Sequence, residues 1–124
     1  MANLINWFEI PAADIHRASK FYSTILDKNI PVQNFGGLTM AMLPMGAQDE
    51  VTGALVQHEG YTPSDTDGAL LYLNGNPDLT TILERIEGAG GKILRPKSQI
   101  SPEVGYMALF TDTEGNRMAL HSNG

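Results

Sequence analysis

The sequence predicts an α+β fold in which two β-α-β-β-β modules form curved mixed sheets around a cleft. The first observation is a repeated order of elements: a strand, an amphipathic helix and three strands occur once in each half of the chain. The second is that one four-stranded module would leave a sheet face bare and could not bury it alone. The halves should therefore pack together, or pair with a second chain, and enclose a cleft. The alternative is two small ferredoxin-like units without a useful cavity.

Length and composition fit a single domain, residues 1–124, with module one at about residues 1–58, a linker at 59–68 and module two at about 69–124. Hydrophobic residues make up 42% of the chain and charged residues 18%, as in globular proteins. The net charge of −6 and the lack of a basic cluster argue against nucleic acid or a membrane as a partner. No apolar run could span a membrane, no signal-peptide pattern is seen and cysteine is absent, so a soluble cytoplasmic protein is expected.

Short apolar runs separated by breaker residues predict the strands. In chain order they are expected at residues 4–10, 30–35, 38–43, 53–58, 69–73, 92–95, 105–110 and 116–121. The glycine pair Gly36-Gly37 between the second and third runs indicates a hairpin. The polar stretch after the fourth run, which contains Pro63, is the linker between the modules.

Two amphipathic helices are expected. The first begins after Asp14, a residue suited to cap it, and ends near Asp27. The second begins at Pro77, which is favoured in a first helical turn, and is stopped by the glycines at 88, 90 and 91. Their apolar stripes consist of Ile15, Ala18, Tyr22, Ile25 and Leu26 in the first helix and of Leu79, Ile82, Leu83 and Ile86 in the second.

Two stretches carry a family resemblance. In the first, Phe8-Glu9-Ile10-Pro11 leads into Asp14, Arg17-Ala18 and Phe21-Tyr22; the second is Phe110-Thr111-Asp112-Thr113-Glu114-Gly115-Asn116-Arg117-Met118-Ala119-Leu120. Together with the doubled order of elements they resemble the vicinal oxygen chelate superfamily, which includes glyoxalase I, bleomycin-resistance proteins and extradiol dioxygenases. Thr113 stands where proline is usual in that family. The chain looks closest to small bacterial glyoxalase-like proteins whose own activity is mostly unassigned.

The shared residues have structural roles. Asp14 caps the helix, Phe21 and Tyr22 anchor that helix on the sheet, and Asp112 with Gly115-Asn116 makes a tight turn. These residues support the fold and assign no reaction, so no residue is given a catalytic role.

The resemblance implies a divalent metal held by about four inward His, Glu or Gln side chains. Carried over position by position, the first ligand falls on Trp7, the second at or next to Gly68 or Ala69, and the last on Ala119. The remaining position falls near Val56 or Gln57 in the strand at 53–58. Three of the four positions therefore lack a donor atom. The usual metal site is predicted to be absent, and no cofactor is expected.

A shifted cluster is the alternative. Glu9 shares the strand face of Trp7, and His121 shares that of Ala119, since side chains alternate along a strand. Glu9, His58 and His121 could thus gather at one mouth of the cleft, either as a metal site or as a polar patch that orients a ligand. If these residues have only structural roles, Glu9 is expected to pair with Arg117 or a backbone donor, and His121 to lie in the frayed end of the C-terminal strand.

Two functions from different classes follow. The first is a binding module that holds or sequesters a small amphipathic ligand in a cleft lined by Trp7, Glu9, His58, Tyr106 and His121. The second is a metal-dependent lyase of the glyoxalase type with a rearranged site, and a third possibility is a degenerate partner of an active homologue. The resemblance also implies a homodimer. Five methionines are expected either to fill the core or to form a flexible lining for a variable apolar ligand; they are Met40, Met42, Met45, Met107 and Met118.

Overall fold

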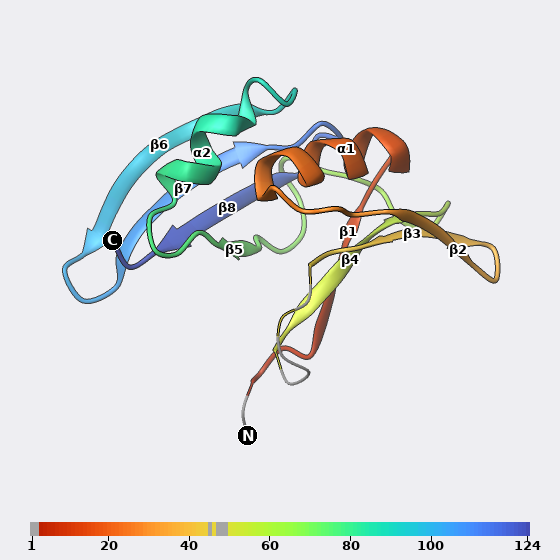
Figure 1. Ribbon diagram of the computed structural model, residues 1–124, viewed down its shortest axis with the longest axis horizontal. Helices are drawn as coiled ribbons and strands as arrows, with labels where there is room; N and C mark the ends of the chain where they lie inside the picture. Colours follow the sequence, from red (N-terminus) through yellow and green to blue (C-terminus); the bar gives the residue numbers. More distant parts are fainter. Residues whose placement is uncertain (1–2, 45, 47–49) are drawn as a thin grey trace.

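The computed structural model describes residues 3–44, 46 and 50–124, and within them the chain forms eight strands and two helices (Figure 1). They give the α+β architecture that the sequence predicts, with two four-stranded mixed sheets. The first sheet has the order β1 (Trp7–Pro11), β4 (Thr52–Gln57), β3 (Leu38–Met42) and β2 (Val32–Phe35). The second has the order β5 (Tyr72–Asn74), β8 (Arg117–Ser122), β7 (Gly105–Thr111) and β6 (Lys92–Ser101). In each sheet the outer strand β1 or β5 runs parallel to its neighbour.

Helix α1 (Ile15–Leu26) begins and ends where the sequence predicts. The carboxylate of Asp14 accepts the backbone N–H groups of His16 at 3.1 Å and Arg17 at 3.2 Å, which satisfies two donors of the first turn. At the other end Asp27 adopts a left-handed conformation with φ 53°, and its N–H bonds back to Ser23. The apolar stripe is buried except for Leu26 at its end, which is partly buried.

Strand β1 is shorter at its start than the predicted run at 4–10. Pairing begins at Trp7, opposite Thr52, because β4 is the only neighbour of β1 and itself begins at Thr52. Residues 4–6 are exposed and belong to no strand. The glycine hairpin is confirmed: Gly36 and Gly37 both have positive φ and connect β2 to β3.

The second module differs from prediction at three boundaries. Strand β5 begins at Tyr72 instead of residue 69, and helix α2 (Thr80–Ile86) begins three residues after Pro77. At that helix start the carboxylate of Asp78 accepts the N–H of Thr80, and the hydroxyl of Ser122 accepts that of Leu79. Strand β6 continues to Ser101 past Pro96, because a register shift between Arg95 and Ser98 leaves Pro96 without a partner residue on β7, so no proline N–H is needed.

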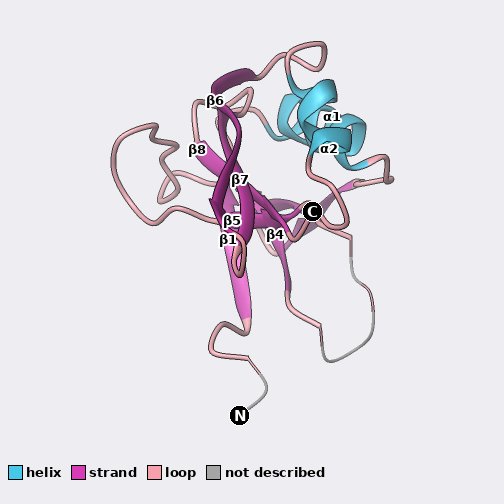
Figure 2. Ribbon diagram, turned by 90° about the vertical axis from the view of Figure 1, so that its left-hand side faces the viewer, coloured by secondary structure: helices cyan, strands magenta, loops and turns pink. Residues whose placement is uncertain are grey.

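One apolar core joins the modules. Helices α1 and α2 lie on the same side of the strands (Figures 1 and 2), and the core between them and both sheets includes Phe21 and Phe110, whose ring centres are 6.1 Å apart. The two halves therefore pack on each other, and the face of each sheet away from the helices carries no helix. That uncovered face is where the resemblance places a site.

The turn between β7 and β8, residues 112–116, fastens module two to the start of α1, and we call it the inter-module turn. The carboxylate of Glu114 accepts two hydrogen bonds from the Arg17 guanidinium, at 2.7 and 3.0 Å. The buried hydroxyl of Tyr22 donates to Asp112 at 2.7 Å. Further bonds run from the Asp14 N–H to Glu114 and from the Asn116 side-chain amide to the Pro11 carbonyl, both at 2.7 Å. The shared residues of the two stretches thus hold the modules at a fixed angle.

Candidate functional site

Trp7 and Glu9 lie on the uncovered face of the first sheet, as alternation predicts. Their neighbours Phe8 and Ile10 belong to the core beneath the helices. The indole N–H of Trp7 donates to Glu9 at 3.4 Å, and Trp7 is 41% exposed. The predicted pairing of Glu9 with Arg117 or a backbone donor is wrong, because the Glu9 carboxylate accepts hydrogen bonds from the Trp7 indole and the Tyr61 hydroxyl.

Tyr61, in the linker at 59–68, is the residue that sequence reasoning missed. Its hydroxyl donates to Glu9 at 2.6 Å, and this bond, followed by partial burial, raises the pKa of the Tyr61 phenol. Its ring packs against a small apolar cluster of Met40, Ala54 and Val56 on the first sheet. The only signal was one aromatic residue in an otherwise polar linker.

His58 joins the same group, since its ring and that of Tyr61 lie edge to face with their centres 6.3 Å apart. The structure therefore brings together three of the five predicted site residues, Trp7, Glu9 and His58, through contacts with Tyr61 or Glu9. His121 lies in the other module, on the uncovered face of the second sheet, where its Nε2 is 2.6 Å from the Val104 carbonyl.

Tyr106 lies elsewhere. It pairs with Ser122, one position along from the Met107–His121 pair, so it faces the helix side of the sheet and His121 faces the opposite side. Its ring packs against the core and beneath the ammonium group of Lys97, 4.5 Å from the ring centre. Tyr106 and His121 thus do not line one surface in this chain.

The residues at the family's metal positions do not fit a metal. Trp7, Ala69 and Ala119 offer no ligating atom, and the Gln57 side-chain oxygen already accepts the backbone N–H of Ile15 at 2.7 Å. The shifted alternative is not supported either, because Glu9 accepts hydrogen bonds from Trp7 and Tyr61, whereas the His121 ring contacts the Val104 carbonyl. Across the described residues no group of three His, Cys, Asp or Glu side chains could hold a metal ion.

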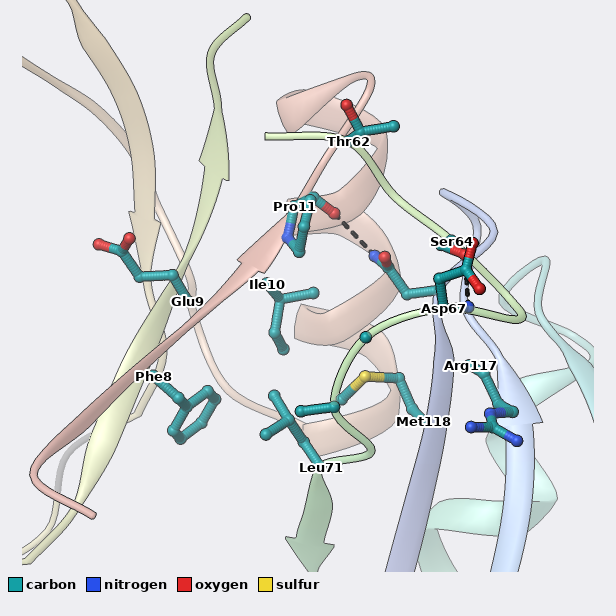
Figure 3. Close-up of a pocket in the computed structure, with 13 residues that line it drawn as sticks. Phe8, Glu9, Ile10, Pro11, Thr62, Ser64, Asp67, Leu71, Arg117 and Met118 are labelled. Carbon is teal, nitrogen blue, oxygen red and sulfur yellow. Dashed lines mark hydrogen bonds between the residues drawn. The ribbon is translucent and has the colours of Figure 1, made fainter. Parts of the chain in front are cut away.

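A cavity of about 270 Å³ lies at the seam between the modules, and we call it the seam cavity (Figure 3). Phe8, Ile10, Leu71 and Met118 point toward its centre and give it an apolar floor (Figure 3). Its polar lining comes from the linker and from β8 with the turn before it; these residues are Thr62, Ser64, Asp67, Asn116 and Arg117. Glu9 borders the cavity, but its carboxylate points away from the centre (Figure 3).

Hydrogen bonds fix the walls of the seam cavity. The Asn116 side chain holds the end of β1 through the Pro11 carbonyl, and the Arg117 N–H donates to the Ser64 carbonyl at 3.2 Å. On the β5 side the Ala119 N–H donates to the Leu71 carbonyl at 2.9 Å. The first sheet, the linker and the second sheet are therefore linked around one space.

A larger apolar groove of about 830 Å³ runs along β1 and β5, and we call it the edge groove. It is lined by exposed Ile5, Trp7 and Tyr72, together with residues of α1, α2 and the β3–β4 connection. A third hollow of about 570 Å³ next to His121 is shallow and includes Tyr72 and Val104. The predicted site residues are thus distributed over separate surfaces.

Both predicted roles meet in Met118, which also lines the seam cavity. Met118 belongs to the main core, while Met40 and Met42 lie in or against the small cluster under Tyr61. Met107 pairs with His121 on the second sheet, and Met45 lies outside the described residues.

Comparison with known proteins agrees with the geometry. The sequence profile of the Glyoxalase/Bleomycin resistance protein/Dioxygenase superfamily matches residues 4–120. A "Glyoxylase-like domain-containing protein" of Didymella fabae is 31% identical over 122 residues, which cover 94% of this chain and 91% of the relative. A glyoxalase-related enzyme from Fulvimarina pelagi superposes with a TM-score of 0.71 at 16% identity, over 96% of this chain and 87% of that one. A glyoxylase/bleomycin resistance protein/dioxygenase domain from Frankia sp. EAN1pec gives 0.70 at 20% identity and 97% of both chains. Within the described residues no helix is long and apolar enough to cross a membrane.

Proposed function

Because the chain belongs to the Glyoxalase/Bleomycin resistance protein/Dioxygenase superfamily, we propose that it is a binding module that holds a small amphipathic molecule in the seam cavity. The observation that carries this proposal is the cavity itself, with an apolar floor and a polar wall where the two modules meet. A site with a few polar groups around an apolar surface is the usual form of a small-molecule site. Its volume of about 270 Å³ suits a ligand smaller than a typical drug molecule.

Binding is favoured over metal chemistry by the side chains at the family's ligand positions. An indole and two methyl groups cannot polarise a substrate oxygen, whereas they can border an apolar surface. The proposed role is therefore to hold or sequester a ligand. Among the described residues Glu9, His58 and His121 form no group that could hold a metal ion, which gives no support to a lyase with a rearranged metal site.

We also propose that the protein forms a homodimer through the edge groove. Strands β1 and β5 are the outermost strands of their sheets, so each has one backbone edge without a strand neighbour. The exposed Ile5, Trp7 and Tyr72 lie along these edges. A second copy that places its β5 beside β1 would extend both sheets and cover these apolar side chains.

A ligand screen tests the binding proposal. The expected result is that at least one class of small amphipathic compound raises the thermal midpoint of unfolding. Leu71→Phe should fill the seam cavity and abolish this rise. Leu94→Phe, on the exposed side of β6 away from the cavity, is the matched control and should keep it.

Two results would contradict the proposal. One is that no compound class shifts the midpoint of the wild-type protein, or that Leu71→Phe leaves the shift unchanged. The other is turnover of a hemithioacetal after addition of Ni or Zn, which would make the protein an enzyme of the glyoxalase type.

A further inference from the structure

Three apolar side chains are buried on the face of the first sheet that lies away from the helices. Ala54 and Val56 of β4 are completely buried, and Met40 of β3 is 9% exposed. The strand register places Ala54 beside Glu9 and Val56 beside Met40, whereas Leu55, between the two β4 residues, belongs to the core beneath the helices. The group that covers these three side chains therefore comes from outside the helical layer.

That group is the ring of Tyr61. It packs against Met40, Ala54 and Val56, and its hydroxyl donates to the Glu9 carboxylate at 2.6 Å. A short O–H···O⁻ bond of this kind is charge-assisted and stronger than a bond between neutral groups. An apolar floor with one well-placed polar anchor is the usual form of a small-molecule site. Tyr61 is thus seated on the sheet as an aromatic ligand would be.

Tyr61 comes from a short stretch, residues 59–63, which we call the strap. The chain is fixed before the strap at His58, whose carbonyl accepts the Tyr61 N–H at 2.9 Å, and after it at Ser64, whose carbonyl accepts an N–H of β8 at 3.2 Å. In the described part of the chain, the bond to Glu9 is the only hydrogen bond that a side chain of the strap makes. Outward movement of the ring therefore breaks one side-chain bond and leaves the fixed points in place.

We propose that this face of the first sheet is a subsite for a small phenol, and that Tyr61 occupies it as a lid while no ligand is bound. The ligand ring would rest on Met40, Ala54 and Val56, and its hydroxyl would donate to Glu9. Such a ligand replaces both contacts of the tyrosine, so the exchange leaves neither the carboxylate nor the apolar floor bare. The subsite is separate from the seam cavity, because the Glu9 carboxylate points away from that cavity (Figure 3).

The Glu9 carboxylate selects for a single donor. One of its oxygens accepts the Trp7 indole N–H at 3.4 Å, and the other accepts the Tyr61 hydroxyl. A phenol brings one O–H to the second oxygen. An ammonium group brings three N–H donors, of which the apolar floor satisfies none, and a carboxylate ligand would be repelled by Glu9.

Binding of 4-methylphenol, which has the structure of a tyrosine side chain, tests the proposal on the full chain. Tyr61→Ala should bind it about tenfold more tightly than wild type, because the lid no longer competes for the subsite. In the same variant 4-methylphenol should bind about tenfold more tightly than toluene, which lacks the hydroxyl; this ratio corresponds to roughly 1.4 kcal/mol. Benzylamine is the probe for a cation and should bind more weakly than 4-methylphenol.

NMR signals of the methionine methyl groups give the dissociation constants and the location. The Met40 signal should shift on titration, whereas that of Met118, which lines the seam cavity, should stay in place. Tyr72→Ala removes an exposed tyrosine from the second sheet and is the matched control, with binding as weak as in wild type. Tyr61→Phe keeps the ring and loses the bond to Glu9, so its affinity should lie between wild type and Tyr61→Ala; it serves if the Ala variant does not fold.

Each other outcome overturns the proposal. Equal affinity in wild type and Tyr61→Ala, or no binding to either Tyr61 variant, would mean that no subsite lies beneath the ring. A shift of Met118 in place of Met40 would move the ligand to the seam cavity, which would support the proposed function and refute the subsite. Toluene or benzylamine binding as tightly as 4-methylphenol would show that Glu9 does not select a phenol.

Discussion

At the scale of single residues, hydrogen bonds between distant side chains decide what each polar group can do. Glu9 is occupied by Tyr61 and Trp7, and Gln57 by the start of α1, so neither is a free ligand. The side chain of Glu114 is fully buried in its contact with Arg17, whose side chain is half exposed. These partners are 42 to 97 residues apart in sequence, apart from the local pair Trp7 and Glu9, and pattern reading along the chain could not pair them.

The hydrogen bond between Tyr61 and Glu9 predicts that one tyrosine ionises at a higher pH than the others. The carboxylate of Glu9 stabilises the protonated phenol, so the pKa of Tyr61 is raised, and ionisation should need a higher pH than an ordinary tyrosine does. In Glu9→Gln this transition should return toward the ordinary value. Absorbance at alkaline pH measures it, with Tyr61→Phe to identify the transition. An identical titration curve for wild type and Glu9→Gln would contradict the bond.

The Glu114 contact predicts a loss of stability in acid. Burial alone would raise the pKa of Glu114, but hydrogen bonds from Arg17, the Asp14 N–H and Thr113 outweigh burial and lower it below 4.5. Since the folded pKa is lowered, the stabilisation is present above the unfolded pKa and is lost as the pH falls through the folded one. Glu114→Gln should lower the free energy of unfolding by about 1–2 kcal/mol at pH 7, a moderate value because Arg17 is half exposed.

Urea unfolding at several pH values measures this effect. The difference between wild type and Glu114→Gln should shrink as the pH is lowered below 4.5. A difference that stays constant over this range would mean that the carboxylate charge contributes nothing to the contact.

At the scale of elements, the sequence predicts which segments become helices and strands better than where they begin. The start of α1 was readable because its cap, Asp14, is local. The starts of β1 and β5 were not, since each strand begins where its parallel partner allows, and that partner comes from 45 or more residues later in the chain. The extension of β6 past Pro96 likewise depends on bulges opposite β7.

The candidate site was only partly predictable for the same reason. Alternation correctly placed Trp7 with Glu9, because that rule acts within one strand. It could not show that Tyr106 and His121, which lie on different strands, face opposite sides, since this depends on the register of β7 against β8. The seam cavity and the role of Tyr61 depend on how the linker crosses both sheets, which no local pattern encodes.

The pairing of β1 with β4 predicts contrasting effects of two glycine substitutions. A Cβ at Gly53 would collide with the backbone oxygen and the ring of Phe8 on β1, so Gly53→Ala should cost about 3 kcal/mol. At Gly60, in the linker, a Cβ meets no neighbouring atom and φ is not positive, so Gly60→Ala should stay within about 0.5 kcal/mol of wild type. Urea unfolding compares the two, and similar losses would contradict the register of β1 against β4.

At the scale of the whole molecule, the helices share one side and the uncovered sheet faces and edges remain on the surface (Figure 2). The seam cavity and the edge groove share Phe8, Ala69 and Leu71, whereas Tyr72 lines the edge groove but not the seam cavity. This division predicts that ligand binding and self-association can be separated by mutation.

The dimer proposal predicts a specific disruption. Tyr72→Lys should place a charge in the edge groove and yield a monomer, because burying an unpaired ammonium group between two copies is unfavourable. Phe35→Lys, on the exposed outer strand of the first sheet, is the matched control and should leave the assembly unchanged. Light scattering after size exclusion gives the masses, and a wild-type protein that is monomeric at all concentrations would refute the proposal.

The inter-module turn also has a consequence for how the chain folds during its synthesis. Its contacts join the start of α1 to residues 97 to 100 positions later in the sequence. During synthesis the first half of the chain is made before Glu114 and Asn116. Until those residues are added, α1 lacks these hydrogen-bond partners, and Phe21 lacks its contact with the Phe110 ring. The two modules are therefore not independent folding units, and the native arrangement closes only when almost the whole polypeptide has been made.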